Sequence, residues 1–147
     1  MDFGLVPTAT HIAALLAALV FGALIGVERE LRRHPAGMHT NALVSLGAAL
    51  YVLAATLVGD PTGPARVAGQ VITGVGFLCA GVILHEGGSV RGINTAVTVW
   101  CASAVGVLAG LGLVLWAALA TLLVLAANVL LHICAHALSA RQRPDER

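Results

Sequence analysis

The sequence predicts an all-α membrane protein, a compact bundle of five transmembrane helices. Of its 147 residues, 59% are hydrophobic and only 10% are charged, and the mean hydropathy is +0.94. A soluble domain carries roughly 25% charged residues, so this chain has too little polar surface to cover itself in water. Its length fits a single transmembrane domain over residues 1–147.

Five apolar segments are long enough to cross a bilayer, which takes about 20 mainly apolar residues in a helix. The first is entered at Pro7, a residue suited to the first turn of a helix. Gly110 and Gly112 predict a turn between the last two segments, which would otherwise merge into one overlong span. The predicted spans are residues 8–27, 40–58, 65–84, 94–110 and 113–136.

Two of the connections have a marked composition. The stretch GDPTGP, residues 59–64, predicts a rigid turn, because its prolines end one helix and begin the next. The stretch HEGGSVRGINT, residues 85–95, predicts a glycine-rich loop. No basic region precedes the first span and no small-residue cleavage site follows it, so we do not expect a removable signal peptide.

The arginines predict how the bundle is oriented. With five spans the connections alternate between the two sides of the membrane, and only Arg66 falls on one of those sides. An excess of arginine marks the cytoplasmic side, so we predict that the N-terminus is outside and the C-terminus is in the cytoplasm. The arginines of the predicted cytoplasmic side are Arg29, Arg32, Arg33, Arg91, Arg141, Arg143 and Arg147.

Several classes of function find no support in the sequence. The chain has no lysine and no basic run with interleaved aromatic residues, which argues against nucleic-acid binding. No hydrolase or phosphate-binding motif occurs, so we expect neither an enzyme nor a cofactor. The three cysteines lie inside apolar runs and provide no disulfide framework; they are Cys79, Cys101 and Cys134.

A dense charged cluster, Glu28-Arg29-Glu30, follows the first span directly. Arginine at the end of a span commonly anchors it in the interface, but two acidic residues are unexpected in a simple anchor. Glu28 and Arg32 are four residues apart, a spacing that allows an ion pair on one face of a helix. The cluster is therefore either an edge of the membrane domain or part of a working site.

Further polar residues fall at the same predicted cytoplasmic level. They open the second span and bracket the loop at residues 85–95, so the inner ends of the first four spans could form a polar vestibule. These residues are His39, Asn41, Ser45, Glu86, Arg91, Asn94, Thr95 and Thr98.

Polar residues also lie within two other spans. At the outer side, Arg66, Gln70 and Thr73 form a polar stripe at i, i+4 and i+7 of the third span. This stripe is either part of a functional site or a set of structural hydrogen bonds to neighbouring helices. In the fifth span, three polar residues lie on one face of the helix. Two of them are histidines four positions apart, a spacing compatible with metal binding, although no further ligand is identifiable. That set is Asn128, His132 and His136.

The placement of the acidic residues bears on ion transport. Glu28, Glu30 and Glu86 fall at the predicted inner edge and Asp60 at the outer edge, with none near the midplane. Ion-coupled carriers usually place an acidic group there, and Mg²⁺ is bound through carboxylates. A carrier is therefore not favoured, but backbone carbonyls or an oligomeric pore could still conduct a cation.

Small residues predict tightly packed helices, since helices in a bilayer associate through close contact. The functional alternative to packing within the five helices is a homodimer seam. The residues concerned are the pairs Gly22 and Gly26, and Gly106 and Gly110, with Gly69, Gly74, Gly76 and Gly81 in the third span.

The order of these motifs resembles the MgtC/SapB family of bacterial inner-membrane proteins. Its first span ends in I-G-x-E-R-E, here residues 25–30, followed by A-G-x-x-T-x-x-L-V-x-L-G-A, here residues 36–48. The stretches RVAGQVITGVGFLCAGVIL, residues 66–84, and VRGINTAVTVWCASAVGVLAG, residues 90–110, complete the match, which covers nearly the whole chain. His39 stands where the family usually has Arg, so the role of this position is not carried over from the family.

The resemblance implies a small multipass protein of the bacterial inner membrane, tied to growth in low Mg²⁺ and, in pathogens, to survival inside host cells. It further implies modulation of other membrane machinery, including the proton-translocating ATP synthase, through protein contacts; the alternative is a transporter or channel for Mg²⁺ or another cation. Many members also have a cytoplasmic C-terminal domain, and we expect only the membrane domain here. Residues that match the polar signature of the family are Glu28, Arg29, Glu30, Thr40, Asp60, Arg66, Gln70, Arg91, Asn94 and Cys101.

Overall fold

The computed structural model describes residues 7–86 and 89–141, and it consists of five long helices and a small hairpin. All five helices are long and apolar enough to cross a membrane, which confirms the predicted helical bundle. In chain order the elements are α1 (Ala9–Leu31), α2 (Met38–Leu57), α3 (Gly63–Val82), β1 (Leu84–Glu86), β2 (Ser89–Arg91), α4 (Ile93–Gly110) and α5 (Val114–Arg141).

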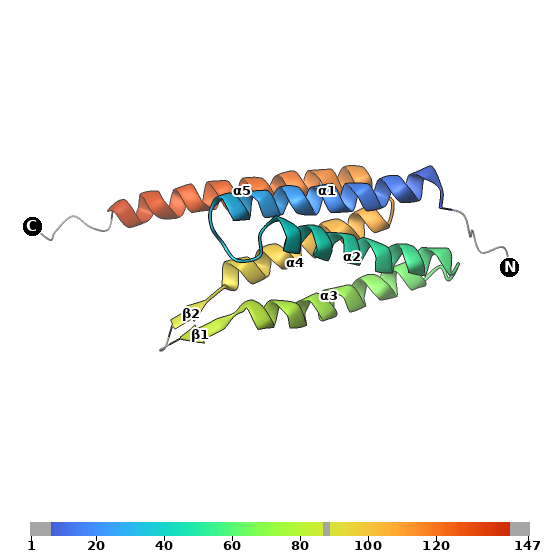
Figure 1. Cartoon of the computed structure of the whole chain (residues 1–147), viewed down its shortest axis with the longest axis horizontal. Coiled ribbons are helices and arrows are strands. Elements are labelled where there is room, and N and C mark those ends of the chain that lie inside the picture. The colour runs from blue at the N-terminus through green and yellow to red at the C-terminus, as the bar shows by residue number, and fades with distance from the viewer. Residues whose placement is uncertain (1–6, 87–88, 142–147) are drawn as a thin grey trace, which may run out of the picture.

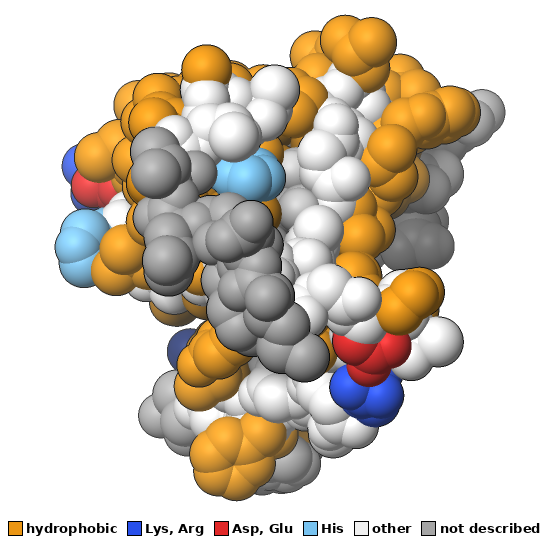
Figure 2. All heavy atoms as spheres, turned by 90° about the vertical axis from the view of Figure 1, so that its right-hand side faces the viewer, with side chains coloured by type: hydrophobic (Ala, Val, Ile, Leu, Met, Phe, Trp, Pro, Cys, Tyr) orange, Lys and Arg blue, Asp and Glu red, His pale blue; other side chains and the backbone are white. Residues whose placement is uncertain are grey.

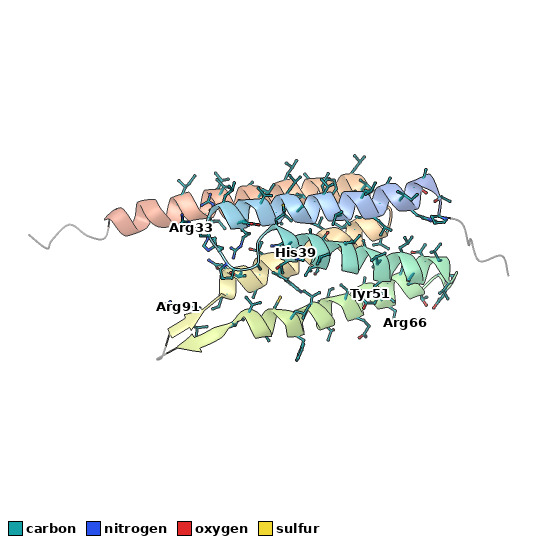
Figure 3. The ribbon with its side chains drawn as sticks, in the orientation of Figure 1. Arg33, His39, Tyr51, Arg66 and Arg91 are labelled. Carbon is teal, nitrogen blue, oxygen red and sulfur yellow. The ribbon has the colours of Figure 1, made fainter. Side chains whose placement is uncertain are left out.

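The helices lie along one common axis and alternate in direction, so that α1 begins at one end of the bundle and α5 finishes at the other (Figure 1). Arg33 and Arg91 lie at one end and Arg66 lies at the opposite end (Figure 3). This separation matches the division of arginines predicted from the sequence. Which end faces the cytoplasm stays a prediction, with the arginine-rich end as the inner one.

Helix boundaries follow local sequence signals. Thr8 caps α1, because its Oγ1 accepts a hydrogen bond from the backbone N–H of His11 at 3.4 Å. Pro64 stands in the first turn of α3, where its missing N–H costs nothing. Gly112 has a φ of 79°, a left-handed conformation that ends the turn between α4 and α5. The predicted break between the last two spans is thus confirmed.

The segment predicted as a glycine-rich loop contains two short strands. β1 and β2 pair in antiparallel register, with Leu84 opposite Arg91 and Glu86 opposite Ser89. The two glycines between the strands are a common signal for a tight hairpin, and strands of three residues are too short to show an alternating pattern. The hairpin extends beyond the ends of α3 and α4 at the arginine-rich end, although α5 reaches further in the same direction (Figure 1).

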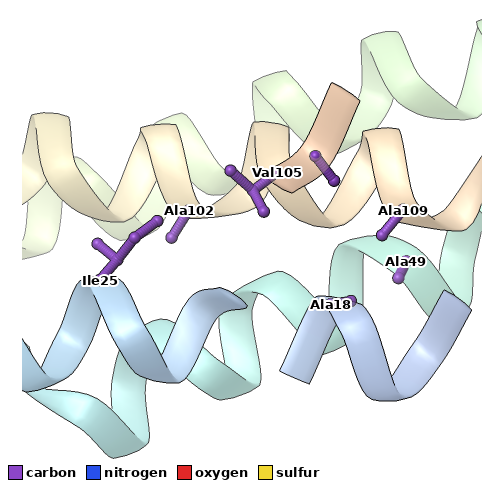
Figure 4. Close-up of a cluster of buried hydrophobic side chains, with 7 residues drawn as sticks. Ala18, Ile25, Ala49, Ala102, Val105 and Ala109 are labelled. Atoms are coloured by element: carbon purple, nitrogen blue, oxygen red, sulfur yellow. The ribbon is translucent and has the colours of Figure 1, made fainter. Parts of the chain in front are cut away.

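α4 forms the centre of the bundle, because it contacts each of the other four helices. A cluster of small buried side chains packs where it meets α1, α2 and α5 (Figure 4). Alanine dominates this cluster, so the helix backbones approach closely. Its members are Ala18, Ile25, Ala49, Ala102, Val105, Ala109 and Ala117.

Glycines make the closest of these approaches. A Cβ atom on Gly106 of α4 would collide with the backbone carbonyl of Ser45 in α2, and one on Gly22 of α1 would lie 2.5 Å from the carbonyl oxygen of Asn41. Gly26 and Gly110 are similarly enclosed. Both GxxxG pairs therefore serve packing within the chain.

The outer surface of the bundle is apolar. Large hydrophobic side chains point outward from every helix; Phe77 and Leu115 are each more than four-fifths exposed. Seen from the end where α1 begins, hydrophobic side chains surround most of the outline and few charged ones appear (Figure 2). Such a surface fits a lipid environment. The side chains that face outward are apolar, and the backbone polar groups are hydrogen-bonded within each helix.

Candidate functional site

The charged cluster at the end of α1 divides into three side chains with different partners. Glu28 pairs with Arg32, with 2.5 Å between Oε1 and Nε, so the ion pair that the spacing allowed is present. Its other oxygen, Oε2, accepts a hydrogen bond from Nδ2 of Asn128 in α5 at 3.4 Å. Glu28 thereby connects α1 to α5.

Arg29 points into the bundle and is only 4% exposed. Its Nη2 donates to the hydroxyl of Thr95 in α4 and to the carbonyl oxygen of Pro35, the latter at 3.4 Å. Its Nε is buried with no hydrogen-bond partner in the described part of the chain. Arg29 is thus a buried cation that links α1, α4 and the connection before α2 through neutral acceptors.

Glu30 is exposed and stabilises the start of α2. Its Oε2 accepts a hydrogen bond from the backbone N–H of Met38 at 3.0 Å. The N-cap residue of α2, Gly37, has no side chain to do this. A carboxylate at a helix N-terminus also interacts favourably with the helix dipole. The two glutamates therefore have separate roles, one in an ion pair and one as a cap.

The polar residues of α2 divide between the interior and the surface. Asn41 is fully buried and its Nδ2 donates to the carbonyl oxygens of Ala36 and Gly37, at 2.6 and 2.9 Å. Ser45 is also buried and donates to the carbonyl of Ala18 in α1 at 2.7 Å. His39 and Thr40 are exposed. Asn41 and Ser45 therefore fasten α2 to its surroundings rather than line an open vestibule.

A crevice of about 600 Å³ opens between α1, α4 and α5, and we call it the α1–α4–α5 crevice. Polar groups gather in it from three helices, so it is the place where the structure brings the predicted polar residues together. Its apolar side comes mainly from α5. The lining residues are Glu28, Arg29, Arg32, His34, Asn94, Val97, Thr98, Cys101, Leu123, Val124, Ala127, Asn128 and Leu131.

A second polar group lies at the opposite end of the bundle. Arg66 contacts Asp60 with 2.9 Å between Nη2 and Oδ2. The other oxygen of Asp60 accepts hydrogen bonds from the backbone N–H and the hydroxyl of Thr62, at 2.9 and 2.8 Å. These hydrogen bonds from Thr62, the backbone one foremost, and the nearby Arg66 hold the pKa of Asp60 below its ordinary value. The group stabilises the turn between α2 and α3.

The other described residues of the predicted polar set do not line the crevice. Arg91 is exposed on β2, and the side chain of Glu86 lies outside the described residues. Gln70 is exposed on α3, and Thr73 donates within its own helix, to the carbonyl of Gly69 at 3.2 Å. The stripe that begins at Arg66 therefore faces outward.

The contribution of α5 could not be predicted from the sequence. Asn128 meets Glu28, from which it is 100 positions distant along the chain; the only signal was its polar character inside an apolar span. The side chains of His132 and His136 lie outside the described residues. Over the residues that the structure does describe, no group of three or more His, Cys, Asp or Glu side chains is arranged to hold a metal ion.

The fold and the placement of its polar groups define a multipass membrane protein. The model of the MgtC family matches residues 15–137, and the chain belongs to this family. It is 50% identical over 125 residues to Protein MgtC of Brucella abortus, covering 85% of this chain and 52% of that protein. It is 51% identical over 121 residues to Protein MgtC of Salmonella typhimurium, covering 82% and 52%.

This chain spans about half the length of the curated relatives it matches. No solved structure matches it. The resemblance drawn from the sequence motifs is thus confirmed at the level of the family.

Proposed function

We propose that this protein is a non-enzymatic modulator of other proteins in the bacterial inner membrane and acts through helix contacts. The family resemblance supplies the setting, which is adaptation to low Mg²⁺ or survival of a pathogen in its host. It also supplies one partner to test, the proton-translocating ATP synthase. The observation that carries the proposal is a set of uncovered small residues on α3, one of which lines an apolar groove.

α3 has four glycines that the other described residues leave uncovered. A Cβ atom added at Gly69, Gly74, Gly76 or Gly81 would have no neighbour within 4 Å. The glycines of α1 and α4, by contrast, are enclosed by other helices. At 3.6 residues per turn, Gly74 and Gly81 lie on one side of α3, and Gly69 and Gly76 lie on another. Since small residues in a membrane let a second helix approach closely, each side has room for a helix from outside this chain.

A groove between α2 and α3 lies on the side of Gly74, which is the one of these four glycines that lines it. It has a volume of about 650 Å³, and its lining is almost wholly apolar apart from Tyr51 and Gln70. Gln70 is exposed, and an amide inside the bilayer is stabilised by a hydrogen bond across a helix interface. The groove residues are Leu43, Val44, Gly47, Ala48, Tyr51, Val67, Gln70, Val71, Gly74, Val75 and Leu78.

Transport of Mg²⁺ is the alternative function, and the electrostatics of the α1–α4–α5 crevice weigh against it. Its carboxylate, Glu28, is already paired with Arg32, and the buried guanidinium of Arg29 lies in the same lining. A divalent cation would therefore meet net positive charge.

The matched pair Gly74→Leu and Gly76→Leu tests the proposal. Both positions have room for a side chain, but only Gly74 lines the groove. We expect Gly74→Leu to abolish co-purification with ATP synthase from membranes and Gly76→Leu to retain it. Equal co-purification by both variants would contradict a role for the groove. Saturable Mg²⁺ uptake by the pure protein in sealed liposomes would instead establish the transporter.

A further inference from the structure

No carboxylate hydrogen-bonds to Arg29 within the described chain, and one carboxylate, Glu28, lines the crevice together with Arg29 and Arg32. A guanidinium stays protonated in proteins, and buried charges are normally paired. Arg29 is 4% exposed, yet its hydrogen bonds go to a hydroxyl and a carbonyl, and its Nε has no partner among the described residues. The neighbouring carboxylate of Glu28 is occupied by Arg32 at 2.5 Å. One surplus positive charge therefore lies in the lining of the α1–α4–α5 crevice.

The crevice is amphiphilic along its length. Its polar part is formed at the end of α1 by Arg29 and Arg32, with Asn128 opposite. Its apolar part is formed by residues of α5 that precede Asn128 in the helix, namely Leu123, Val124 and Ala127, and Leu123 is 62% exposed. The polar part lies at the end of the bundle that carries Arg33 (Figure 3), where the headgroup layer would meet the protein.

We propose that the crevice binds an anionic phospholipid, with its phosphate beside Arg29 and an acyl chain along α5. The volume of about 600 Å³ accommodates a headgroup and the first part of a chain. Basic pockets between transmembrane helices bind anionic headgroups in this way. The proposal is independent of the partner that the α2–α3 groove would bind.

The lining of the crevice favours an anionic phospholipid over free phosphate and over a zwitterionic phospholipid. A free phosphate would neutralise Arg29 but would leave the apolar wall of Val97, Leu123 and Ala127 without an occupant. A zwitterionic phospholipid would bring an ammonium group into the crevice and restore the surplus positive charge. An anionic phospholipid satisfies both parts of the lining.

Native mass spectrometry of the purified 147-residue chain tests the proposal. The protein is equilibrated in detergent with equal amounts of phosphatidylglycerol and phosphatidylethanolamine. We expect one phosphatidylglycerol to be retained in preference to phosphatidylethanolamine. Arg29→Gln should weaken this retention about tenfold, the effect of losing one charge-assisted hydrogen bond, whereas Arg33→Gln, at an exposed position outside the lining, should leave it unchanged.

A second pair of variants keeps the test decisive if Arg29→Gln does not fold. Ala126 and Ala127 are adjacent and exposed on α5, and only Ala127 lines the crevice. Ala127→Phe should block lipid retention and Ala126→Phe should not. Equal behaviour of these two variants, or equal retention of both lipids by the wild type, would overturn the proposal. Displacement of the lipid by millimolar inorganic phosphate would identify a site for the free anion and would also overturn it.

Discussion

The guanidinium of Arg29, near the end of α1, donates a hydrogen bond to the hydroxyl of Thr95, 66 positions further along in α4. Both side chains are buried, with exposed fractions of 4% for Arg29 and 3% for Thr95. This bond connects the charged end of the first span to the central helix. The stability of the bundle should therefore depend on it.

We predict that Thr95→Val destabilises the protein by about 1–3 kcal/mol, because the change removes an acceptor from a buried charged donor. Thr98→Val is the matched control. Thr98 is similarly buried in α4, but its hydroxyl donates within its own helix, to the carbonyl of Asn94 at 2.8 Å. Thermal unfolding in detergent would measure both. Similar losses for the two variants would show that the bond to Arg29 adds little.

Glu30→Ala should loosen the first turn of α2, because the N–H of Met38 then loses its acceptor. Hydrogen exchange at the Met38 amide should accelerate, while exchange in the middle of α2 stays unchanged. Glu30→Gln keeps an acceptor oxygen and should retain most of the protection. If both variants exchange at the wild-type rate, the cap does not stabilise the helix in solution.

Gly106→Ala should disrupt the packing of α4 on α2, since the added methyl group meets the Ser45 carbonyl. Overpacking of this kind costs about 1–3 kcal/mol or more. Gly69→Ala is the control, because its added methyl group meets open space and alanine favours the helix by up to about 1 kcal/mol. The melting temperature of Gly106→Ala should fall below that of the wild type, and the melting temperature of Gly69→Ala should be unchanged or higher. Equal melting temperatures for the two variants would contradict the close approach of α4 to α2.

The pKa of Asp60 offers a pH-dependent test at the opposite end of the bundle. A carboxyl with a lowered folded pKa contributes stability above its unfolded pKa, about 3.9, and loses it as the pH falls through the folded value. Because Thr62 contributes most of the lowering, Arg66→Gln should raise the pKa only slightly. A ¹³C carboxyl titration by NMR would measure it. A return to the ordinary value in Arg66→Gln would contradict this order of causes.

The helices were predictable because a membrane span needs a long apolar run, and each predicted span overlaps its helix over most of its length. The ion pair of Glu28 and Arg32 was predictable from spacing alone, since both residues lie on one helix. The contact between Glu28 and Asn128 was not, because it depends on how α1 and α5 pack. The same holds for the glycines: their sequence spacing predicts close packing, but only the assembled bundle shows which glycines of α3 stay uncovered.

The central position of α4 has a consequence for biogenesis. The helix that contacts all the others is the fourth to be synthesised. During insertion α1, α2 and α3 can pack on one another, but the contacts that each of them makes with α4 form only after α4 has left the ribosome. A nascent chain stalled before residue 93 should therefore be far more sensitive to membrane proteases than one stalled after α4 has been threaded.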